Sequence, residues 1–323
     1  MRQYSYSTLR LDLSRHPKVL YAAEMCCQRH IVYRDGLHQY ATIFQTTLAN
    51  MAFFSSSSIL ILSALCPFVF SHSMVADVWA DGIHYNGFNP NDNLTPYPSD
   101  TPGWYTTNVG GSPLYPIDTN QPQIICAKGG SNANVSVPVT AGTDVRLRWW
   151  QVNVAWPSSH HGPIINYLAP CNGPCSEVDM TTLKFVKISE RGFVRKTEEA
   201  EGYWAADELI ADDGSWDVRI PAGLAPGEYV LRHEIIALHV AYTGTGAYSS
   251  SGAEFYPQCV SLKVEGSGMK VINDGVDART FYSGSEPSLR KNIHTGFDHS
   301  DFVMPGPSLW TGASAKKERS FFG

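Results

Sequence analysis

Residues 144–149 read Asp-Val-Arg-Leu-Arg-Trp, a strict alternation of polar and apolar side chains. A period of two places one set of side chains on each face of a β-strand. Three further segments have the same character and end near turn residues, at 215–220, 228–232 and 260–264. Strands of this kind, separated by turns, indicate sheets that pack face to face. We therefore predict an all-β protein with an immunoglobulin- or fibronectin-like antiparallel β-sandwich.

Helical patterns are short in this sequence, whereas irregular segments are long. The two best helical candidates lie at about 180–188 and 198–209. Segments 82–125 and 266–310 contain many Gly, Pro, Asn and Tyr residues, which favour turns and loops. Loops of this length usually form a functional site or a binding surface. We expect a sandwich with long loops and few short helices.

The composition excludes two broad classes of protein. The chain has 323 residues, of which 43% are hydrophobic, 12% aromatic and only 17% charged. This proportion of apolar residues suffices for a core and argues against a disordered chain. The sequence has no block of Lys and Arg residues that could follow a phosphate backbone. Nucleic-acid binding is therefore not expected.

An apolar segment divides the chain into two unequal parts. Residues 51–71 read MAFFSSSSILILSALCPFVFS, with an apolar run of 12 residues at 59–70. A membrane-spanning helix needs roughly 17 to 25 residues, so this run is too short to span a bilayer comfortably. Val69 and Ser71 are small enough for the recognition positions of a signal peptidase. We interpret 51–71 as a secretory signal peptide whose removal makes His72 the first residue.

The residues before this segment do not belong to the predicted domain. Residues 1–50 show no sustained hydrophobic period, and a signal peptide should begin a protein. We interpret them as a disordered gene-model extension, with translation starting at Met51. The alternative is a real extension that leaves the signal uncleaved or turns it into an internal anchor. Residues 72–312 would then form one domain, followed by a disordered tail at 313–323.

Removal of residues 1–71 leaves an acidic remainder with four cysteines. This step takes away six Lys and Arg and three Asp and Glu, so the net charge changes from −6 to −9. An even number of cysteines in a secreted chain indicates disulfides, and four cysteines allow three pairings. Cys171 and Cys175 flank a tight Gly-Pro turn and pair most easily with each other, which leaves Cys126 with Cys259. The alternative at the turn is zinc binding, although no second Cys or His pair lies beside it at ligand spacing.

His72 has unusual chemistry if it is N-terminal. Its α-amine and its Nδ1 atom can chelate one metal ion, and a nitrogen from another His completes a flat set of three. Cu(II) suits such tetragonal nitrogen coordination. The amine must lose its proton to bind, so binding depends on pH. A His that follows a cleavage site by accident is the alternative, and the rest of the chain has to decide between the two.

Three downstream segments favour the metal site. They are SHHGPIINYL at 159–168, LRHEIIALH at 231–239 and GAEFYPQC at 252–259. Together with His72 they resemble the lytic polysaccharide monooxygenases of auxiliary activity family nine, which are fungal copper enzymes. The patterns HxGPxxxYL, LRxExIALH and FYxxC occur in the family's order. The resemblance continues through Met-Pro-Gly-Pro at 304–307 to about Gly312.

The resemblance implies a role for each matching residue. His72 and His160 would hold one copper ion, and Tyr256 would lie at its long axial position. His239 would act from outside the ligand set and help to position the oxygen species. The family's disulfides match the pairs Cys126–Cys259 and Cys171–Cys175.

Glu254 departs from the family, which usually has Gln at this position. In a strand, Glu254 and Tyr256 would point to one face and Phe255 to the core. An ionised Glu only accepts hydrogen bonds, whereas Gln can donate one. A Glu whose pKa is raised by burial keeps its proton and can donate as well. We expect Glu254 to act with His239 and Tyr256 in catalysis, in oxygen activation or proton delivery.

The implied activity is oxidative cleavage of glycosidic bonds in cellulose or related β-1,4-glucans, at C1 or C4 of a sugar. It would use one copper ion per chain, O₂ or H₂O₂, and an external electron donor, either a small reductant or a redox enzyme. The protein would be secreted, extracellular and monomeric, with no membrane contact after signal cleavage. Asn134 begins the sequon Asn-Val-Ser and is a candidate glycosylation site.

Aromatic residues in loops are candidates for stacking on sugar rings. Relatives often present a Tyr in the C-terminal loop, where this chain has His294. We expect part of the loop aromatics to pack beneath their loops instead. The candidates are Tyr85, Trp104, Tyr105, Tyr115, Tyr242 and Tyr248.

Three other functions are alternatives. A non-catalytic secreted sandwich that binds copper or a glucan would keep the same His residues. His233 and Glu234 suggest a zinc-protease helix, but that motif needs its second His four residues after the first, whereas His239 is six residues away. A glycoside hydrolase needs two positioned carboxylates. The carboxylates available near turns are Asp212, Asp213, Asp217 and Glu228.

Overall fold

The computed structural model describes residues 73–88, 100–107, 112–150, 156–246, 249–296 and 298–313. The chain divides into two units, residues 1–68 and 69–323, and every described residue lies in the second. The predicted extension at 1–50, the signal peptide at 51–71, His72 and nearly all of the predicted tail lie outside the described residues. None of the helices in the described ranges is long and apolar enough to cross a membrane.

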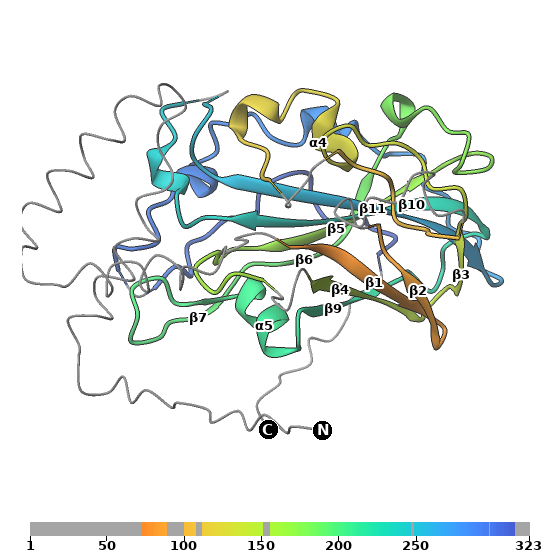
Figure 1. Cartoon of the computed structure of the whole chain (residues 1–323), viewed down its shortest axis with the longest axis horizontal. Helices are drawn as coiled ribbons and strands as arrows, with labels where there is room; N and C mark the ends of the chain where they lie inside the picture. The colour runs from red at the N-terminus through yellow and green to blue at the C-terminus, as the bar shows by residue number, and fades with distance from the viewer. Residues whose placement is uncertain are drawn as a thin grey trace, which may run out of the picture. The chain divides into compact units, whose positions relative to one another are not determined.

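Four antiparallel strands form one sheet, in the order β2-β1-β4-β9 (Figure 1). The strands are β1 (Met74–Ala80), β2 (Ile83–Asn86), β4 (Asp144–Trp150) and β9 (Ser215–Arg219). The predicted alternation in β4 is confirmed, since Val145, Leu147 and Trp149 are fully buried. Sequence analysis did not identify β1, because a β-bulge between Val75 and Asp77 interrupts its period of two.

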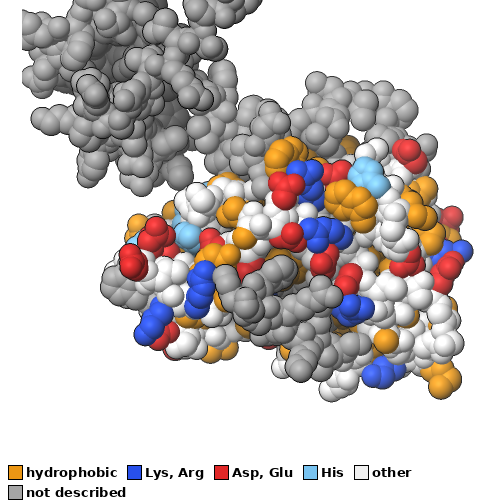
Figure 2. All heavy atoms as spheres, turned by 90° about the horizontal axis from the view of Figure 1, so that it is seen from below, with side chains coloured by type: hydrophobic (Ala, Val, Ile, Leu, Met, Phe, Trp, Pro, Cys, Tyr) orange, Lys and Arg blue, Asp and Glu red, His pale blue; other side chains and the backbone are white. Residues whose placement is uncertain are grey.

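The outer face of this sheet carries ion pairs. Lys and Arg side chains lie next to Asp and Glu side chains when the molecule is seen from this side (Figure 2). Arg146 pairs with Asp212 and Asp217, and Arg148 pairs with Asp213. Three of the four carboxylates considered for a glycoside hydrolase are therefore engaged with arginines at the surface.

Five strands form the second sheet, in the order β3-β11-β10-β5-β6. They are β3 (Val137–Thr140), β5 (Ile164–Pro170), β6 (Val186–Arg191), β10 (Gly227–Ala237) and β11 (Glu254–Glu265). All neighbours in this sheet are antiparallel except β3 and β11, which are parallel. The strands predicted at 228–232 and 260–264 are confirmed as parts of the longer β10 and β11. A separate ribbon pairs β7 (Phe193–Arg195) with β8 (Tyr203–Trp204).

The helices in the described residues are short, as expected. The α-helices are α4 (Gln123–Cys126) and α5 (Ala205–Ala211). The 3-10 helices are η4 (Pro116–Asp118), η5 (Met180–Thr182), η6 (Ala241–Thr243), η7 (Ala278–Thr280) and η8 (Pro287–Arg290).

One of the two helix predictions was wrong and the other was partly right. Segment 180–188 forms only η5 before the chain enters β6, because its Phe-Val-Lys-Ile sequence is β-branched and aromatic and pairs with β5. Segment 198–209 is helical only at its end. There the Asp207 carboxylate accepts a hydrogen bond from the backbone N–H of Trp204 and so caps the start of α5.

The predicted antiparallel β-sandwich is confirmed, and its larger sheet is buried on both faces. Leu231 and Ile235 of β10 belong to the core between the two sheets, together with Trp149 of β4. Val230 and Ile236, which point the other way, belong to a second core that lies beneath the loops and α4. In agreement with this, every residue of β10 from Tyr229 to Ala237 is buried, including the hydrogen-bonded side chains of Arg232, His233 and Glu234.

The second core contains a buried ion pair. The side chains of Arg232 and Glu234 are both fully buried and face each other, with Arg232 Nη2 2.7 Å from Glu234 Oε1. Arg232 also donates to the backbone carbonyls of Ile124 and Ile125 in α4, and the Tyr282 hydroxyl donates to Glu234. The pair thus joins α4 and the C-terminal segment to the centre of the sheet.

Both predicted disulfides are present. Cys126 at the end of α4 is bonded to Cys259 of β11, and Cys171 is bonded to Cys175. The second bond excludes the alternative of a zinc site at this turn. In the chain-entropy model, closing a loop of the size spanned by the first bond stabilises the fold by roughly 4–5 kcal/mol.

Replacement of Glu234 tests the buried ion pair. Glu234→Gln leaves the Arg232 charge buried without its counter-ion, so we expect the free energy of unfolding to fall by about 3–5 kcal/mol. Urea denaturation measures the change. Glu265→Gln, at the exposed end of β11, is the matched control and should change it by less than about 0.5 kcal/mol. Equal stability of the two variants contradicts the assignment.

Candidate metal centre

Three neighbouring strands bring the candidate site together. Glu254 begins β11 and lies opposite Ala237, the last residue of β10. His239 follows two residues after β10 ends. His160 precedes β5, whose first residue Ile164 pairs with β10. Because β5, β10 and β11 are adjacent, the three side chains meet at one end of the sheet.

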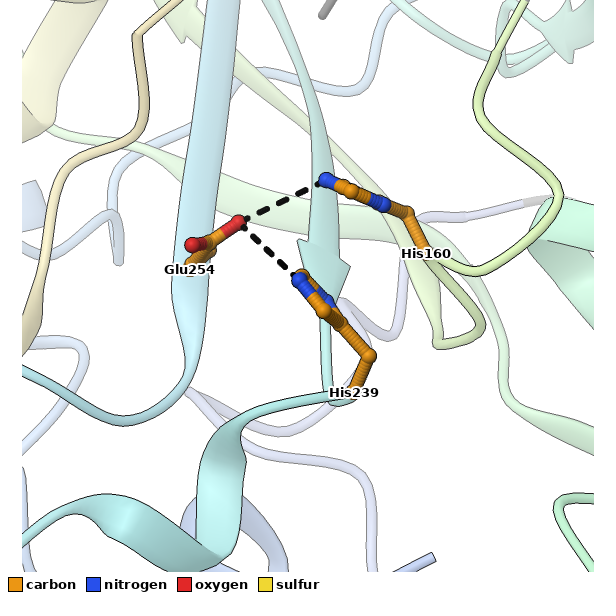
Figure 3. A group of neighbouring side chains, drawn as sticks. All are labelled: His160, His239 and Glu254. Carbon is orange, nitrogen blue, oxygen red and sulfur yellow. Dashed lines mark ion pairs between the residues drawn. The ribbon is translucent and has the colours of Figure 1, made fainter. Parts of the chain in front are cut away.

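His160, His239 and Glu254 form a compact cluster (Figure 3). The Oε2 atom of Glu254 lies 3.7 Å from Nε2 of His160 and 3.9 Å from Nε2 of His239. The two imidazole rings stack with their centroids 4.0 Å apart. His160 and Glu254 are buried, and His239 is nearly so.

Tyr256 completes this cluster from the same face of β11. Its hydroxyl donates to Glu254 Oε2 at 2.6 Å, while Phe255 between them points into the second core. This confirms the predicted orientation of the three residues. The Trp156 ring packs edge-on against Tyr256 with centroids 4.9 Å apart. Trp156 also donates through Nε1 to the backbone carbonyl of His160.

The loop before β5 fixes the direction in which His160 points. Its Nδ1 atom is 3.1 Å from the Ser159 hydroxyl, so Nε2 is the atom that faces the carboxylate. Two residues later, Gly162 lies against β10, and a Cβ atom there would be 1.9 Å from the carbonyl oxygen of Ile236. Only glycine permits this close approach. Backbone hydrogen bonds from Ile236 and Leu238 to the loop then hold it in place.

Burial dominates the electrostatics of the cluster. It raises the pKa of Glu254 to about 7, although hydrogen bonds from Tyr256 and Tyr115 lower it. Burial and the nearby Glu254 charge raise the pKa of Tyr115 to about 12 and that of Tyr256 well above its usual value. Glu254 is therefore mostly protonated at slightly acidic pH, and both phenols stay neutral.

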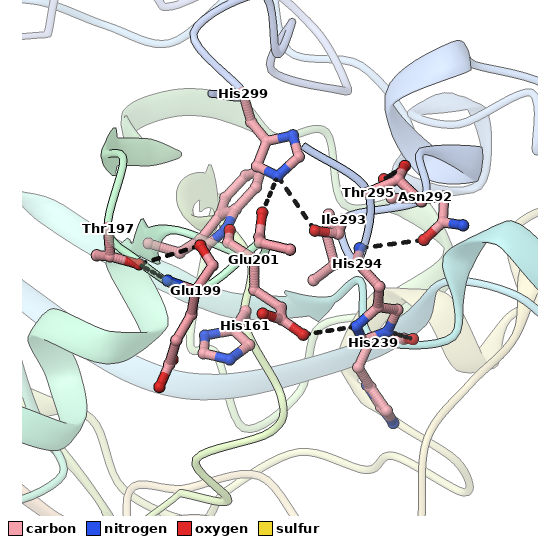
Figure 4. A network of polar contacts seen from close by, with 12 residues as sticks. His161, Thr197, Glu199, Glu201, His239, Asn292, Ile293, His294, Thr295 and His299 are labelled. Atoms are coloured by element: carbon pink, nitrogen blue, oxygen red, sulfur yellow. Dashed lines mark hydrogen bonds and ion pairs between the residues drawn. The ribbon is translucent and has the colours of Figure 1, made fainter. Parts of the chain in front are cut away.

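A second polar network lies beside the cluster (Figure 4). The Nδ1 atom of His294 lies 2.7 Å from Oε1 of Glu201, and its Nε2 atom donates to the backbone carbonyl of His239 at 2.7 Å. His161 bonds to Asp207 through Nδ1. Burial opposes a charge on His161, but the hydrogen bond and charge of Asp207 outweigh it and raise the pKa. His161 is therefore directed to α5, whereas its neighbour His160 is directed to the cluster.

The structure brings together four of the five residues singled out for the site: His160, His239, Glu254 and Tyr256. His72 lies outside the described residues. His233, considered for a zinc protease, is in β10 between the sheets, where it accepts from Trp149 Nε1 and bonds Asn166. Burial and the Arg232 charge lower its pKa to about 3, so His233 is a neutral core residue.

Sequence reasoning missed two members of the site. Trp156 gave no signal, since a single Trp four residues before a His has no periodic pattern. Tyr115 was considered only as a surface aromatic, but a β-bridge from Leu114 to Phe255 places it beside Glu254. Of the other loop aromatics, Trp104 is buried and Tyr242 is half exposed. Tyr248 lies outside the described residues.

The donor atoms fit a transition-metal ion. Imidazole nitrogen binds Cu, Zn, Fe and Ni, and a carboxylate oxygen adds a harder donor. In the part of the chain that the structure describes, the donor atoms of His160, His239 and Glu254 all lie within 4.8 Å of one another.

Comparison with known proteins gives one consistent family. The profile of Auxiliary Activity family 9 (formerly GH61) matches residues 72–302. Lytic polysaccharide monooxygenase F of this family, from Malbranchea cinnamomea, is 41% identical over 251 residues, covering 78% of this chain and 96% of that protein. The extended catalytic domain of H. jecorina LPMO9A superposes with a TM-score of 0.67 at 37% identity, covering 75% and 92% of the two chains. A cellulose-active polysaccharide monooxygenase from M. thermophila gives 0.59 at 28% identity, covering 74% and 99%.

The raised pKa of Glu254 predicts a pH-dependent stability. Between its usual value of 4.5 and about 7, the folded chain keeps a proton that the unfolded chain has lost. Rising pH therefore favours the unfolded state over this range, by about 1.4 kcal/mol per unit at most. We expect metal-free wild type to lose stability from pH 5 to 7 relative to Glu254→Gln, and no further above that range. Urea denaturation in chelator measures both proteins, and parallel pH profiles contradict the buried, protonated carboxyl.

Proposed function

The chain belongs to Auxiliary Activity family 9 and is a copper-dependent lytic polysaccharide monooxygenase, and from this premise we propose that His72 and His160 hold its copper ion. His72 would be the first residue of the mature enzyme. The observation that carries the proposal is the family match, which begins at residue 72, directly after the interpreted signal peptide. Non-catalytic binding is not favoured by this family membership.

The positions of the described neighbours support this pairing. β1 begins at Met74, and its residue Val75 lies opposite Trp149 of β4. The Trp149 ring packs edge-on against Trp156, at 5.1 Å between centroids, and Trp156 packs edge-on against His160. The first strand thus runs beside the aromatic residues that support His160. An α-amine, an Nδ1 atom and the Nε2 atom of His160 would be a nitrogen set of the kind that Cu(II) prefers.

Copper in such a site supplies the one-electron redox chemistry by which O₂ or H₂O₂ oxidises a sugar C–H bond at C1 or C4. The residues around it would control protons and access. Glu254 would hold and transfer a proton at Oε2, the atom that faces both imidazoles. Tyr256 donates to the same oxygen and would limit access to the copper ion, while His239 would act without binding that ion. These three are the proposed catalytic residues.

We propose cellulose or a related β-1,4-glucan as the substrate. The structural similarity to the cellulose-active M. thermophila enzyme supports it. Tyr242 is 50% exposed and lies edge-on to His294, at 5.8 Å between centroids. It is a candidate for stacking on a sugar ring beside the metal centre. The ring of His294 is engaged with Glu201 and with the backbone carbonyl of His239.

The remaining expectations concern the cellular setting. We propose that the enzyme is secreted, acts as an extracellular monomer and receives electrons from a small reductant or a redox enzyme. Asn134 lies in an exposed bend, which supports glycosylation at its sequon. N-terminal sequencing and the intact mass of the secreted protein decide the first point, and a mass that includes residues 1–71 contradicts it.

Loss of either proposed nitrogen source should abolish the activity. We expect His160→Ala, and insertion of Gly-Ser between Ser71 and His72, each to reduce oxidised oligosaccharides from cellulose at least 100-fold, on the order expected when a metal site loses a ligand. The assay contains copper and a small reductant, and mass spectrometry measures the products.

The matched control for these variants is His84→Ala. His84 is an exposed histidine of β2 that pairs with Asp77, outside the metal centre. We expect it to keep the wild-type yield. Normal yield from the Gly-Ser insertion contradicts the proposed N-terminal ligand, and absence of oxidised products from the wild-type protein with every glucan tested contradicts the substrate proposal.

A further inference from the structure

We propose that His160, His239 and Glu254 form a metal site of their own, which binds a divalent ion of the zinc type without the N-terminal amine. The proposal does not depend on where the mature chain begins. It rests on the geometry of the cluster, in which the Glu254 carboxylate places an oxygen donor beside the two imidazoles, all donor atoms lying within 4.8 Å of one another.

The three donor atoms are already close to a metal-binding arrangement (Figure 3). Glu254 Oε2 lies 3.7 Å and 3.9 Å from the two Nε2 atoms. Zinc bonds of about 2.0–2.2 Å in a tetrahedral site place neighbouring donors about 3.3–3.6 Å apart. Each carboxylate–imidazole pair would have to approach by up to about half an ångström. The two imidazole rings, now stacked with centroids 4.0 Å apart, would also have to turn so that both Nε2 atoms face the ion. Two His and one Glu, with an open position for water, are a known zinc ligand set.

Contacts outside the cluster hold each donor in place. Tyr256 and Tyr115 both hydrogen-bond the Glu254 carboxylate. The Ser159 hydroxyl bonds Nδ1 of His160, so that Nε2 faces the ion. His294 donates to the backbone carbonyl of His239 and fixes the short segment after β10. Such contacts orient the residues that bind a metal ion and raise the affinity of the site for that ion.

The site has a consequence for the copper centre. His160 is a ligand in both, so one chain holds one ion at a time in either position. A chain whose N-terminus is blocked would keep the Glu254 site, whereas a chain that begins at His72 would offer the three-nitrogen set in competition. Gln at position 254 would lack the negative charge, so the variant Glu254→Gln would have no such competing site.

The experiment uses the secreted full chain with Gly-Ser inserted between Ser71 and His72. Zinc sulfate is titrated into the metal-free protein, by calorimetry and by competition with a chromogenic chelator. We expect one zinc per chain, and at least 100-fold weaker binding in Glu254→Gln and in His239→Ala, which lose a ligand. Glu265→Gln, the same change on the same strand at its exposed end, should bind like the parent protein.

Two outcomes overturn the proposal: no stoichiometric zinc in the blocked chain, or equal affinity in Glu254→Gln and Glu265→Gln. Circular dichroism and thermal unfolding show whether each variant folds, and His239→Ala provides a second test if Glu254→Gln does not. Copper titration of the chain that begins at His72 tests the proposed copper site separately from the zinc site. Failure of that chain to bind copper contradicts the proposed function but does not affect the result of the zinc titration.

Discussion

The pairing of β10 with β11 on one side and β5 on the other is the constraint on which the metal centre depends. Ala237 opposite Glu254, and Ile235 opposite Ile164, set where the three chain segments meet. A slip of one residue would turn each side chain to the opposite face. Such a slip is opposed on both faces of β10, since Leu231 and Ile235 belong between the sheets while Arg232 and Glu234 belong beneath α4. The geometry of the site is therefore set by two cores at once.

Two glutamates on neighbouring strands are both buried, but their surroundings differ. Glu234 lies on the outer face beside the Arg232 guanidinium, which balances its charge. Glu254 lies on the inner face, where its partners are phenols and imidazoles and its pKa is raised to about 7. Both residues are glutamates. The Glu234 carboxylate stabilises the fold through its ion pair, whereas the Glu254 carboxylate takes part in the metal centre. Low dielectric surroundings make the second group responsive to protons and to cations.

Much of the fold followed from the alternation of polar and apolar residues, and much of the site followed from motifs. The alternation identified β4 and β9 and parts of β10 and β11, while the motifs identified His160, His239, Glu254 and Tyr256. The bulge hid β1. At 180–188 the β-branched and aromatic residues near the end of the segment favoured the strand that pairs with β5, and the helix prediction overlooked them. Tyr115 and Trp156 reach the cluster through contacts between distant or irregular segments, for which sequence has no periodic signal. His294 was noticed as a replacement, but its bond to Glu201 spans 93 residues and could only be seen in the fold.

The buried guanidinium also reinforces one of the covalent cross-links. Arg232 is the cross-strand neighbour of Cys259. Its side chain donates a hydrogen bond to the backbone carbonyl of Ile125, the residue before Cys126. The Arg232 contacts therefore hold the segments that carry Cys126 and Cys259 side by side in addition to the disulfide. The covalent bond and the guanidinium thus join the same two segments, which are 133 residues apart in the sequence, and both oppose the entropy gained when that loop opens.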